Sequence, residues 1–174
     1  MTAIVREAAP ADDAAITAFV RAQPGATPFH LPAWSRAVER GCGQRARYLV
    51  AERDRAIAGV LPLTEMRSPL FSNALVSAGF AVDGGVLGDE AEALVAAARA
   101  FGLPSIELRG GTAPAGWVVD ETTYLGFVRP LAADDEADLK AIPRKQRAEV
   151  RKALANDLEL VTGGAERAAE HYAV

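Results

Sequence analysis

The chain has little of the chemistry that cysteine and histidine provide. Its 174 residues include one cysteine, Cys42, and two histidines, His30 and His171. A single cysteine cannot form an internal disulfide, and these three residues lack the clustering that a zinc site requires. We therefore expect neither redox chemistry nor a bound metal.

Long apolar runs are also missing. No window approaches 18 uninterrupted apolar residues, and the opening "MTAIVREAAPADD" has no apolar signal-peptide core. We interpret the chain as cytoplasmic. Half of its residues are apolar and 24% are charged, which is typical of a folded globular domain.

Patterns for nucleophilic catalysis and nucleotide binding are missing too. There is no G-x-S-x-G, and Cys42 has no histidine within ten residues. "GCGQRA" (41–46) lies between an expected helix and an expected strand, the reverse of a dinucleotide-binding turn, so it is interpreted as a helix end. "DGG" (83–85) is interpreted as a turn, whereas "RGG" (109–111) fits either a surface turn or an arginine that contacts an anion.

The sequence does contain alternating strand and helix signals, which predict an α/β fold with a mixed sheet. The strongest signal is a β-hairpin over residues 46–52 and 56–65. The other expected strands are 2–8, 74–80, 104–109, 122–131 and 158–163. The expected helices are 11–22, Pro32 to Gly41, 89–102, 133–142, 143–155 and 165–174.

Positive charge is concentrated in "AIPRKQRAEVRKAL" (141–154), although the formal net charge of the chain is −4. On the helix that Pro143 is expected to start, Arg144, Arg147 and Arg151 share one stripe and Lys145 lies on the next. Cations at a helix N-terminus are unfavourable by roughly 0.3 to 1 kcal/mol each, whereas a bound phosphate would reverse that sign. A solvated face paired with the acidic "DDEAD" upstream is the alternative.

His30 and Trp34 lie in "TPFHLPAW" (27–34), at the start of an expected helix. An imidazole there can hydrogen-bond a ligand, and an indole can stack on a sugar or a base. A structural histidine and a core tryptophan fit the same pattern. No residue stands out as a general base, so the catalytic residue is left unassigned.

Three segments together resemble the FemAB family of acyltransferases, and within it the members associated with PEP-CTERM/exosortase systems. They are "TPFHLPAW", the hairpin "RYLVAERDRAIAGVLPLTE" (47–65) and the segment from Thr122 to Leu160. The hairpin resembles that of the GNAT acyltransferase fold, a mixed α/β fold with a central antiparallel hairpin flanked by helices. Family members have two such domains in tandem, so the resemblance implies that this chain is the N-terminal half of a longer protein.

The resemblance implies a GNAT-like domain over residues 1–132, and a basic connecting helix with the start of a second domain over 133–174. It implies an enzyme that forms amide bonds on a phosphate-bearing cell-wall or cell-surface precursor. His30, Trp34, Arg144, Lys145, Arg147 and Arg151 would bind that substrate. The acyl donor, aminoacyl-tRNA or acyl-CoA, would bind through the missing second domain, so no cofactor is expected on this chain.

One departure from the GNAT pattern bears on the donor. The loop Q/R-x-x-G-x-G/A is not present, because "RGCGQR" (40–45) has Arg45 where glycine or alanine is required. Two other functions stay open from the sequence: a stand-alone GNAT N-acetyltransferase, and a non-catalytic domain that binds an anionic carbohydrate or nucleic acid. The oligomeric state is not specified.

Overall fold

The computed structural model describes residues 3–70, 72–111 and 113–173. The chain divides into two compact units, Met1–Asp120 (unit 1) and Glu121–Val174 (unit 2). Each unit is described by itself.

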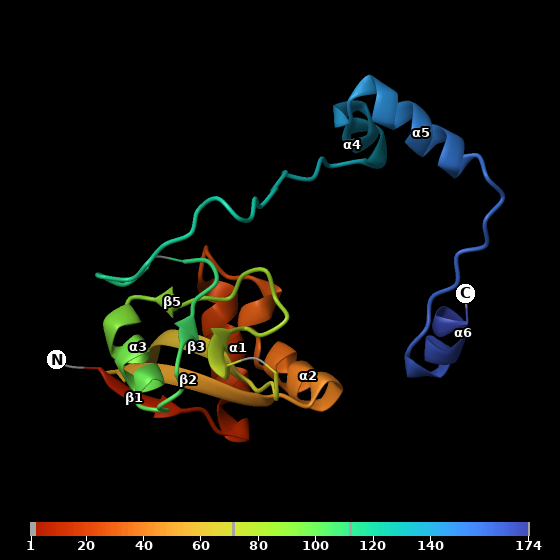
Figure 1. Cartoon of the computed structure of the whole chain (residues 1–174). Helices are drawn as coiled ribbons and strands as arrows, with labels where there is room; N and C mark the ends of the chain where they lie inside the picture. The colour runs from red at the N-terminus through yellow and green to blue at the C-terminus, as the bar shows by residue number, and fades with distance from the viewer. Residues whose placement is uncertain (1–2, 71, 112, 174) are drawn as a thin grey trace. The chain divides into compact units, whose positions relative to one another are not determined.

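Unit 1 is built on a mixed sheet (Figure 1). Its strands follow the order β1-β2-β3-β4-β6, and the short β5 pairs with β3 beside β4. All pairs are antiparallel except β4 with β6, which is parallel. The strands are β1 (Ile4–Glu7), β2 (Arg45–Arg53), β3 (Ala56–Met66), β4 (Ala74–Ser77), β5 (Leu87–Gly88) and β6 (Ile106–Glu107).

The predicted β-hairpin is confirmed as β2 and β3, the longest strands of the sheet. Asp54 and Arg55 form its two-residue turn, and both have positive φ angles, 52° and 64°, as a type I′ turn requires. The register places Arg53 opposite Ala56 and shifts after Ala51 at an irregularity.

Helices cover both faces of the sheet, which confirms the predicted α/β class with a central antiparallel hairpin flanked by helices. Alternate residues of β2 and β3 belong to two different apolar clusters, as the two-residue period of a strand requires. One cluster includes Leu49, Leu61 and Leu63 with Leu94 and Ala98 of α3 (Ala91–Arg99). The other includes Tyr48, Val50 and Val60 with Ile16 and Val20 of α1 (Asp13–Ala22).

Three shorter or peripheral elements complete unit 1: η1 (Pro10–Asp12), η2 (Pro28–His30) and α2 (Pro32–Cys42). Pro32 starts α2 as predicted, but the prediction that Gly41 ends it is wrong. Gly41 is helical, and the left-handed residue after the helix is Gly43, with φ 65°. Gly43 supplies the conformation that terminates helices without a Cβ clash.

Unit 2 consists of short helices joined by irregular segments (Figure 1). They are α4 (Asp135–Ala141), α5 (Arg144–Leu154), η3 (Ala165–Arg167) and α6 (Ala168–Tyr172). Asp134 caps α4 by accepting a hydrogen bond from the Ala137 backbone N–H at 2.8 Å. None of the described residues of unit 2 is buried.

The strands predicted over 122–131 and 158–163 are wrong, because neither segment has regular secondary structure. Tyr124, Phe127 and Val128 are almost fully exposed. A strand requires a neighbour that accepts and donates its backbone hydrogen bonds. The described residues of unit 2 include no strand, so the β-forming side chains of these segments predicted a conformation that lacks a partner strand there. β4 also ends earlier than predicted, at Ser77.

Candidate functional site

The candidate site lies at the carboxyl ends of β4 and β6. These strands are parallel, with Leu75 opposite Ile106 and Val76 opposite Glu107, so both ends meet at one edge of the sheet. Ligands of α/β proteins commonly bind beyond the carboxyl ends of parallel strands. Two loops extend from that edge: the β4–β5 loop (residues 78–86) and the "RGG" turn (109–111).

The two loops interlock through their glycines. A side chain on Gly85 would collide with the Gly110 carbonyl, and one on Gly110 would collide with the Asp83 carboxylate. Gly110 also has a φ of 73°, a conformation that favours glycine. The "DGG" and "RGG" motifs thus belong to one structure in which each requires small residues in the other.

The start of the β4–β5 loop is anchored to a strand and a helix of unit 1. The Gly79 N–H donates a hydrogen bond to Thr64 Oγ1 of β3 at 3.1 Å. Trp34 Nε1 of α2 donates to the Gly79 carbonyl at 3.1 Å, and Phe29 packs edge-on against the indole. The indole is therefore fixed against the loop, and its ring is partly exposed.

Arg109 anchors the other side of the same loop. Its backbone N–H donates to Ser77 Oγ at 2.7 Å, and its Nη1 donates to the Ala81 carbonyl at 2.8 Å. Its Nε pairs with Glu107 at 2.6 Å. This guanidinium therefore holds the loop, and the expectation that it contacts an anion is untested.

Two residues of the β4–β5 loop have unfavourable backbone conformations. Ala78 and Phe80 have φ angles of 42° and 62°, which cost non-glycine residues on the order of 1 to 3 kcal/mol each. The Phe80 side chain is nonetheless 54% exposed. The surrounding hydrogen bonds hold this strain, and such stored strain is common at functional sites.

His30 is a buried support of the loop, 3% exposed. Its Nδ1 accepts a hydrogen bond from the Thr27 backbone N–H at 3.0 Å, so the neutral ring carries its proton on Nε2. Burial lowers the pKa of His30, although the Asp83 carboxylate and backbone contacts at Gly85 and Thr27 oppose that shift. Contact between His30 and a substrate, as predicted, would require the loop to move.

Tyr48 reaches the same region from β2. Its hydroxyl donates to the His30 carbonyl at 2.5 Å. Burial, and then the negative charge of Asp13, raise the pKa of Tyr48 well above its usual range. The phenol therefore stays protonated and serves as a hydrogen-bond donor.

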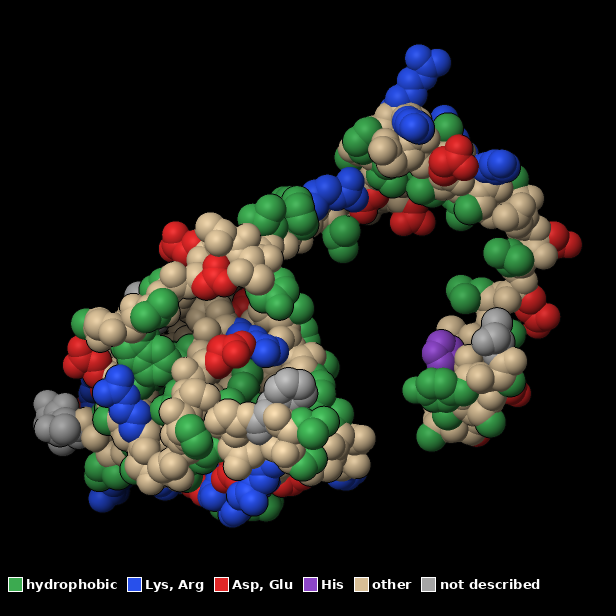
Figure 2. Space-filling view, viewed as in Figure 1, with side chains coloured by type: hydrophobic (Ala, Val, Ile, Leu, Met, Phe, Trp, Pro, Cys, Tyr) green, Lys and Arg blue, Asp and Glu red, His purple; other side chains and the backbone are tan. Residues whose placement is uncertain are grey.

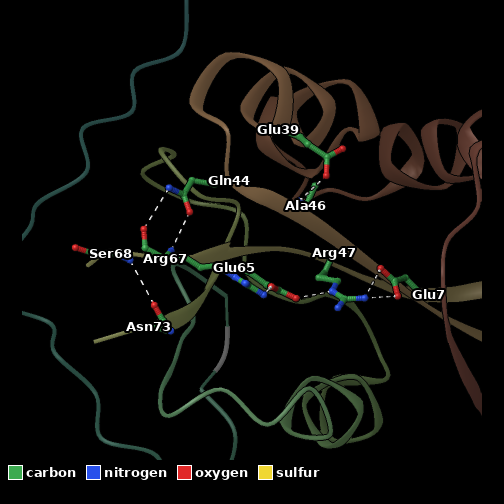
Figure 3. Close-up of polar contacts among 9 residues, drawn as sticks. All are labelled: Glu7, Glu39, Gln44, Ala46, Arg47, Glu65, Arg67, Ser68 and Asn73. Carbon is green, nitrogen blue, oxygen red and sulfur yellow. Dashed lines mark hydrogen bonds and ion pairs between the residues drawn. The ribbon is translucent and has the colours of Figure 1, made fainter. Parts of the chain in front are cut away.

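A second polar cluster lies on the α3 face of the sheet (Figure 3). Glu65 of β3 is 3% exposed and pairs with Arg47 and Arg67, each at 2.7 Å. Arg47 also pairs with Glu7 and lies over the Phe101 ring. Gln44 accepts a hydrogen bond from the backbone N–H of Arg67 at 2.8 Å.

Glu65 was not identified from the sequence, although its position in the strand predicts that its side chain is buried. Leu61 and Leu63 face inward, so the next residue of that period does too. Burial alone would raise the pKa of Glu65, but hydrogen bonds from Arg47 and then Arg67 lower it overall. A general base at neutral pH needs a raised pKa, so this carboxylate fits an ion pair instead.

The remaining predicted site residues lie on α5 of unit 2. Pro143 precedes the helix as predicted, and Arg144, Lys145 and Arg147 occupy its first turn or lie next to it, with Arg151 one turn further. Within the described residues, none of these four cations has an ion pair. Figure 2 shows cationic side chains projecting from this helix.

The described part of the chain contains neither a metal-ligand cluster nor a membrane-spanning helix. No three His, Cys, Asp or Glu side chains gather there as metal ligands would. None of its helices is long and apolar enough to cross a membrane.

No family model matches the chain, and a search of curated proteins finds no match. Among solved structures it is similar to a GNAT family acetyltransferase from Staphylococcus aureus, at 15% identity and a TM-score of 0.46, over 75% of this chain and 100% of that one. It is also similar to a ribosomal-protein-alanine N-acetyltransferase from Brucella melitensis, at 11% identity and a TM-score of 0.43, over 94% and 98% of the two chains. A transcriptional regulator from Bacillus halodurans gives 14% identity and a TM-score of 0.37, over 93% and 99%.

Proposed function

We propose that the chain is a GNAT-like domain of a FemAB-type acyltransferase that forms amide bonds on a phosphate-bearing cell-wall or cell-surface precursor. The observation that carries the proposal is the sheet of unit 1. An antiparallel hairpin continues into a parallel β4–β6 pair, with interlocked glycine loops at the carboxyl ends of that pair. This arrangement provides a rigid edge on which a substrate can be positioned.

Trp34 and His30 have different parts in the proposal. The partly exposed indole of Trp34 provides a surface for a sugar or peptide of the acceptor. His30 supports the β4–β5 loop from beneath, and it reaches the acceptor only when that loop moves. Both residues therefore contribute to the surface at the carboxyl ends of β4 and β6.

The α5 cations are proposed to bind the phosphates of the acceptor. Arg144, Arg147 and Arg151 form a stripe without carboxylate partners in the described residues, and Lys145 lies beside it. Guanidinium groups pair well with phosphate oxygens, and the free N–H groups of a helix N-terminus favour the same charge. Neutralising the stripe would also remove its unfavourable interaction with the helix dipole.

The proposed catalytic device is proximity between an amine and an activated acyl group, carried by aminoacyl-tRNA or CoA. No covalent enzyme intermediate is involved. The amine attacks the acyl carbonyl, the amide forms, and the ester or thioester bond to the carrier breaks as the amine loses its proton. No described side chain is assigned as the base for that proton.

Isothermal titration with a UDP-linked muropeptide tests the proposal. Wild type should bind, and Arg147→Ala should weaken binding about tenfold, the loss of one charge-assisted contact. Lys152→Ala is the matched control: it removes one positive charge from the same helix at a residue outside the proposed phosphate site, and it should bind as wild type does. Equal binding by Arg147→Ala and wild type, or no binding by either, would remove the phosphate role. Tight binding of acetyl-CoA instead would favour a stand-alone N-acetyltransferase.

A further inference from the structure

Two adjacent hollows in unit 1 lie around Trp117, away from the interlocked loops. One, of about 350 Å³, is lined by the start of β6 and the turn before it, including Ser105. The other, of about 300 Å³, lies against α3 near Glu92. Arg99 and Trp117 line both hollows. These volumes are at the small end of the range for ligand sites.

Arg99 is the cation that lines both hollows, and its charge is not neutralised by a carboxylate of the described residues. Its guanidinium carbon lies 5.6 Å from the centroid of the Trp117 ring, and no carboxylate of the described residues pairs with it. Contact with an aromatic face orients a guanidinium and leaves its N–H donors available for an anion.

Trp117 provides the apolar part of the surface. Its ring is partly buried, and its indole N–H has no hydrogen-bond partner among the described residues. The C–H face of a pyranose stacks on such a ring, while its hydroxyls need donors and acceptors nearby. The Ser105 hydroxyl and the Glu92 carboxylate line the two hollows on either side and can serve those hydroxyls.

We propose that this surface binds an acidic oligosaccharide, with one sugar ring on Trp117 and its carboxylate on Arg99. A carboxylate, like a phosphate, can pair with the guanidinium fork in two parallel hydrogen bonds. Glu92 would bind the hydroxyls of the neighbouring ring. The inference does not depend on the proposed acyltransferase function, because it uses no residue of that site.

Nuclear magnetic resonance of the full chain tests this site. The probe is a tetrasaccharide of alternating glucuronate and N-acetylglucosamine. The chain has two tryptophans, so each indole N–H gives one signal. We expect the Trp117 signal to shift on titration and the Trp34 signal to stay. No shift at Trp117, or equal shifts at both, would overturn the site.

Variants test whether binding depends on Arg99 and Trp117 and not on cations elsewhere in the chain. Arg99→Gln should weaken binding about tenfold and Trp117→Ala should abolish it, whereas Trp117→Phe should retain part of it as a milder change. Arg21→Gln, an exposed cation of α1, should bind as wild type does. A neutral N-acetylglucosamine tetramer should bind wild type about tenfold more weakly, with no further loss in Arg99→Gln.

Three further outcomes would contradict the proposal: equal binding of the neutral and the acidic tetramers, unchanged acidic binding by Arg99→Gln, or loss of acidic binding in Arg147→Ala but not in Arg99→Gln. The last would place the sugar on α5. Failure of muropeptide binding in the calorimetric experiment would leave this result unaffected.

Discussion

The two units differ in burial: unit 1 contains two buried apolar clusters, whereas none of the described residues of unit 2 is buried. In unit 1, β2 and β3 place alternate side chains into two apolar clusters, and Leu61 and Ile16 are completely buried. In unit 2, Leu154, Leu158 and Leu160 are largely exposed, although their sequence contains as much helix and strand signal. Local pattern forms an element, but only a packing partner gives that element much stability.

The largest expected difference between the units is in the cost of removing a leucine. Leu61→Ala should lower the free energy of unfolding by about 2 to 5 kcal/mol, because it leaves a cavity in the core. Leu154→Ala should change it by less than about 0.5 kcal/mol, because that side chain is 72% exposed. Urea unfolding followed by circular dichroism measures both. Similar losses of unfolding free energy in the two variants would mean that the Leu154 side chain of α5 is buried against other residues.

Breaking an ion pair should also lower the free energy of unfolding more in unit 1 than in unit 2. Glu65→Gln removes the carboxylate that pairs with the mostly buried Arg47, and should cost about 1.5 to 3 kcal/mol. Glu170→Gln, which breaks an exposed pair with Arg167, should cost less than about 0.5 kcal/mol. Urea unfolding again provides the comparison. A negligible loss in Glu65→Gln would show that Glu7 alone satisfies Arg47.

The same carboxylate should contribute to acid sensitivity. The pKa of Glu65 is lowered in the folded chain, so the unfolded chain takes up its proton first as pH falls. Its stabilisation is complete above the ordinary glutamate pKa of about 4.3 and is lost progressively below it. Wild type should therefore lose stability more steeply than Glu65→Gln below about pH 4.3. Parallel curves would contradict the shift.

His30 should also make the stability of the chain depend on pH, with a smaller effect than Glu65 and at a higher pH. Burial lowers its pKa, so the unfolded chain binds the proton more readily, and stability should fall as pH drops below about 6.5. His30→Gln should cost about 1 kcal/mol at pH 7 and flatten that slope. The exposed His171→Gln is the control and should keep the wild-type slope. Unfolding between pH 5 and 8 gives both values.

The sequence predicted the local elements well and their partners less well. The hairpin was readable because alternation and the "ERDR" turn lie within one short segment. The meeting of "DGG" and "RGG" was not readable, because it depends on the parallel pairing of β4 with β6, about thirty residues apart. The strand predicted over residues 122–131 failed for the converse reason: its residues favour a strand, but the described part of unit 2 contains no strand that could pair with it.

The site residues divide in the same way. The α5 helix and its cationic stripe follow from spacing alone, and the structure contains that helix as predicted. His30 and Trp34 were identified by residue type, and only the fold shows that one is buried beneath the β4–β5 loop and the other bonded to it. Their contact with substrate, and that of the α5 cations, stays a prediction.

Amide hydrogen exchange, with and without the UDP-linked muropeptide, tests the central contrast most directly. We expect β2 and β3 to exchange slowly in both samples, and α5 to exchange rapidly alone and more slowly with the ligand, because phosphate contacts would stabilise its first turns. Arg147→Ala should lose that ligand-dependent protection. Slow exchange of α5 without ligand, or no change on adding it, would contradict the account.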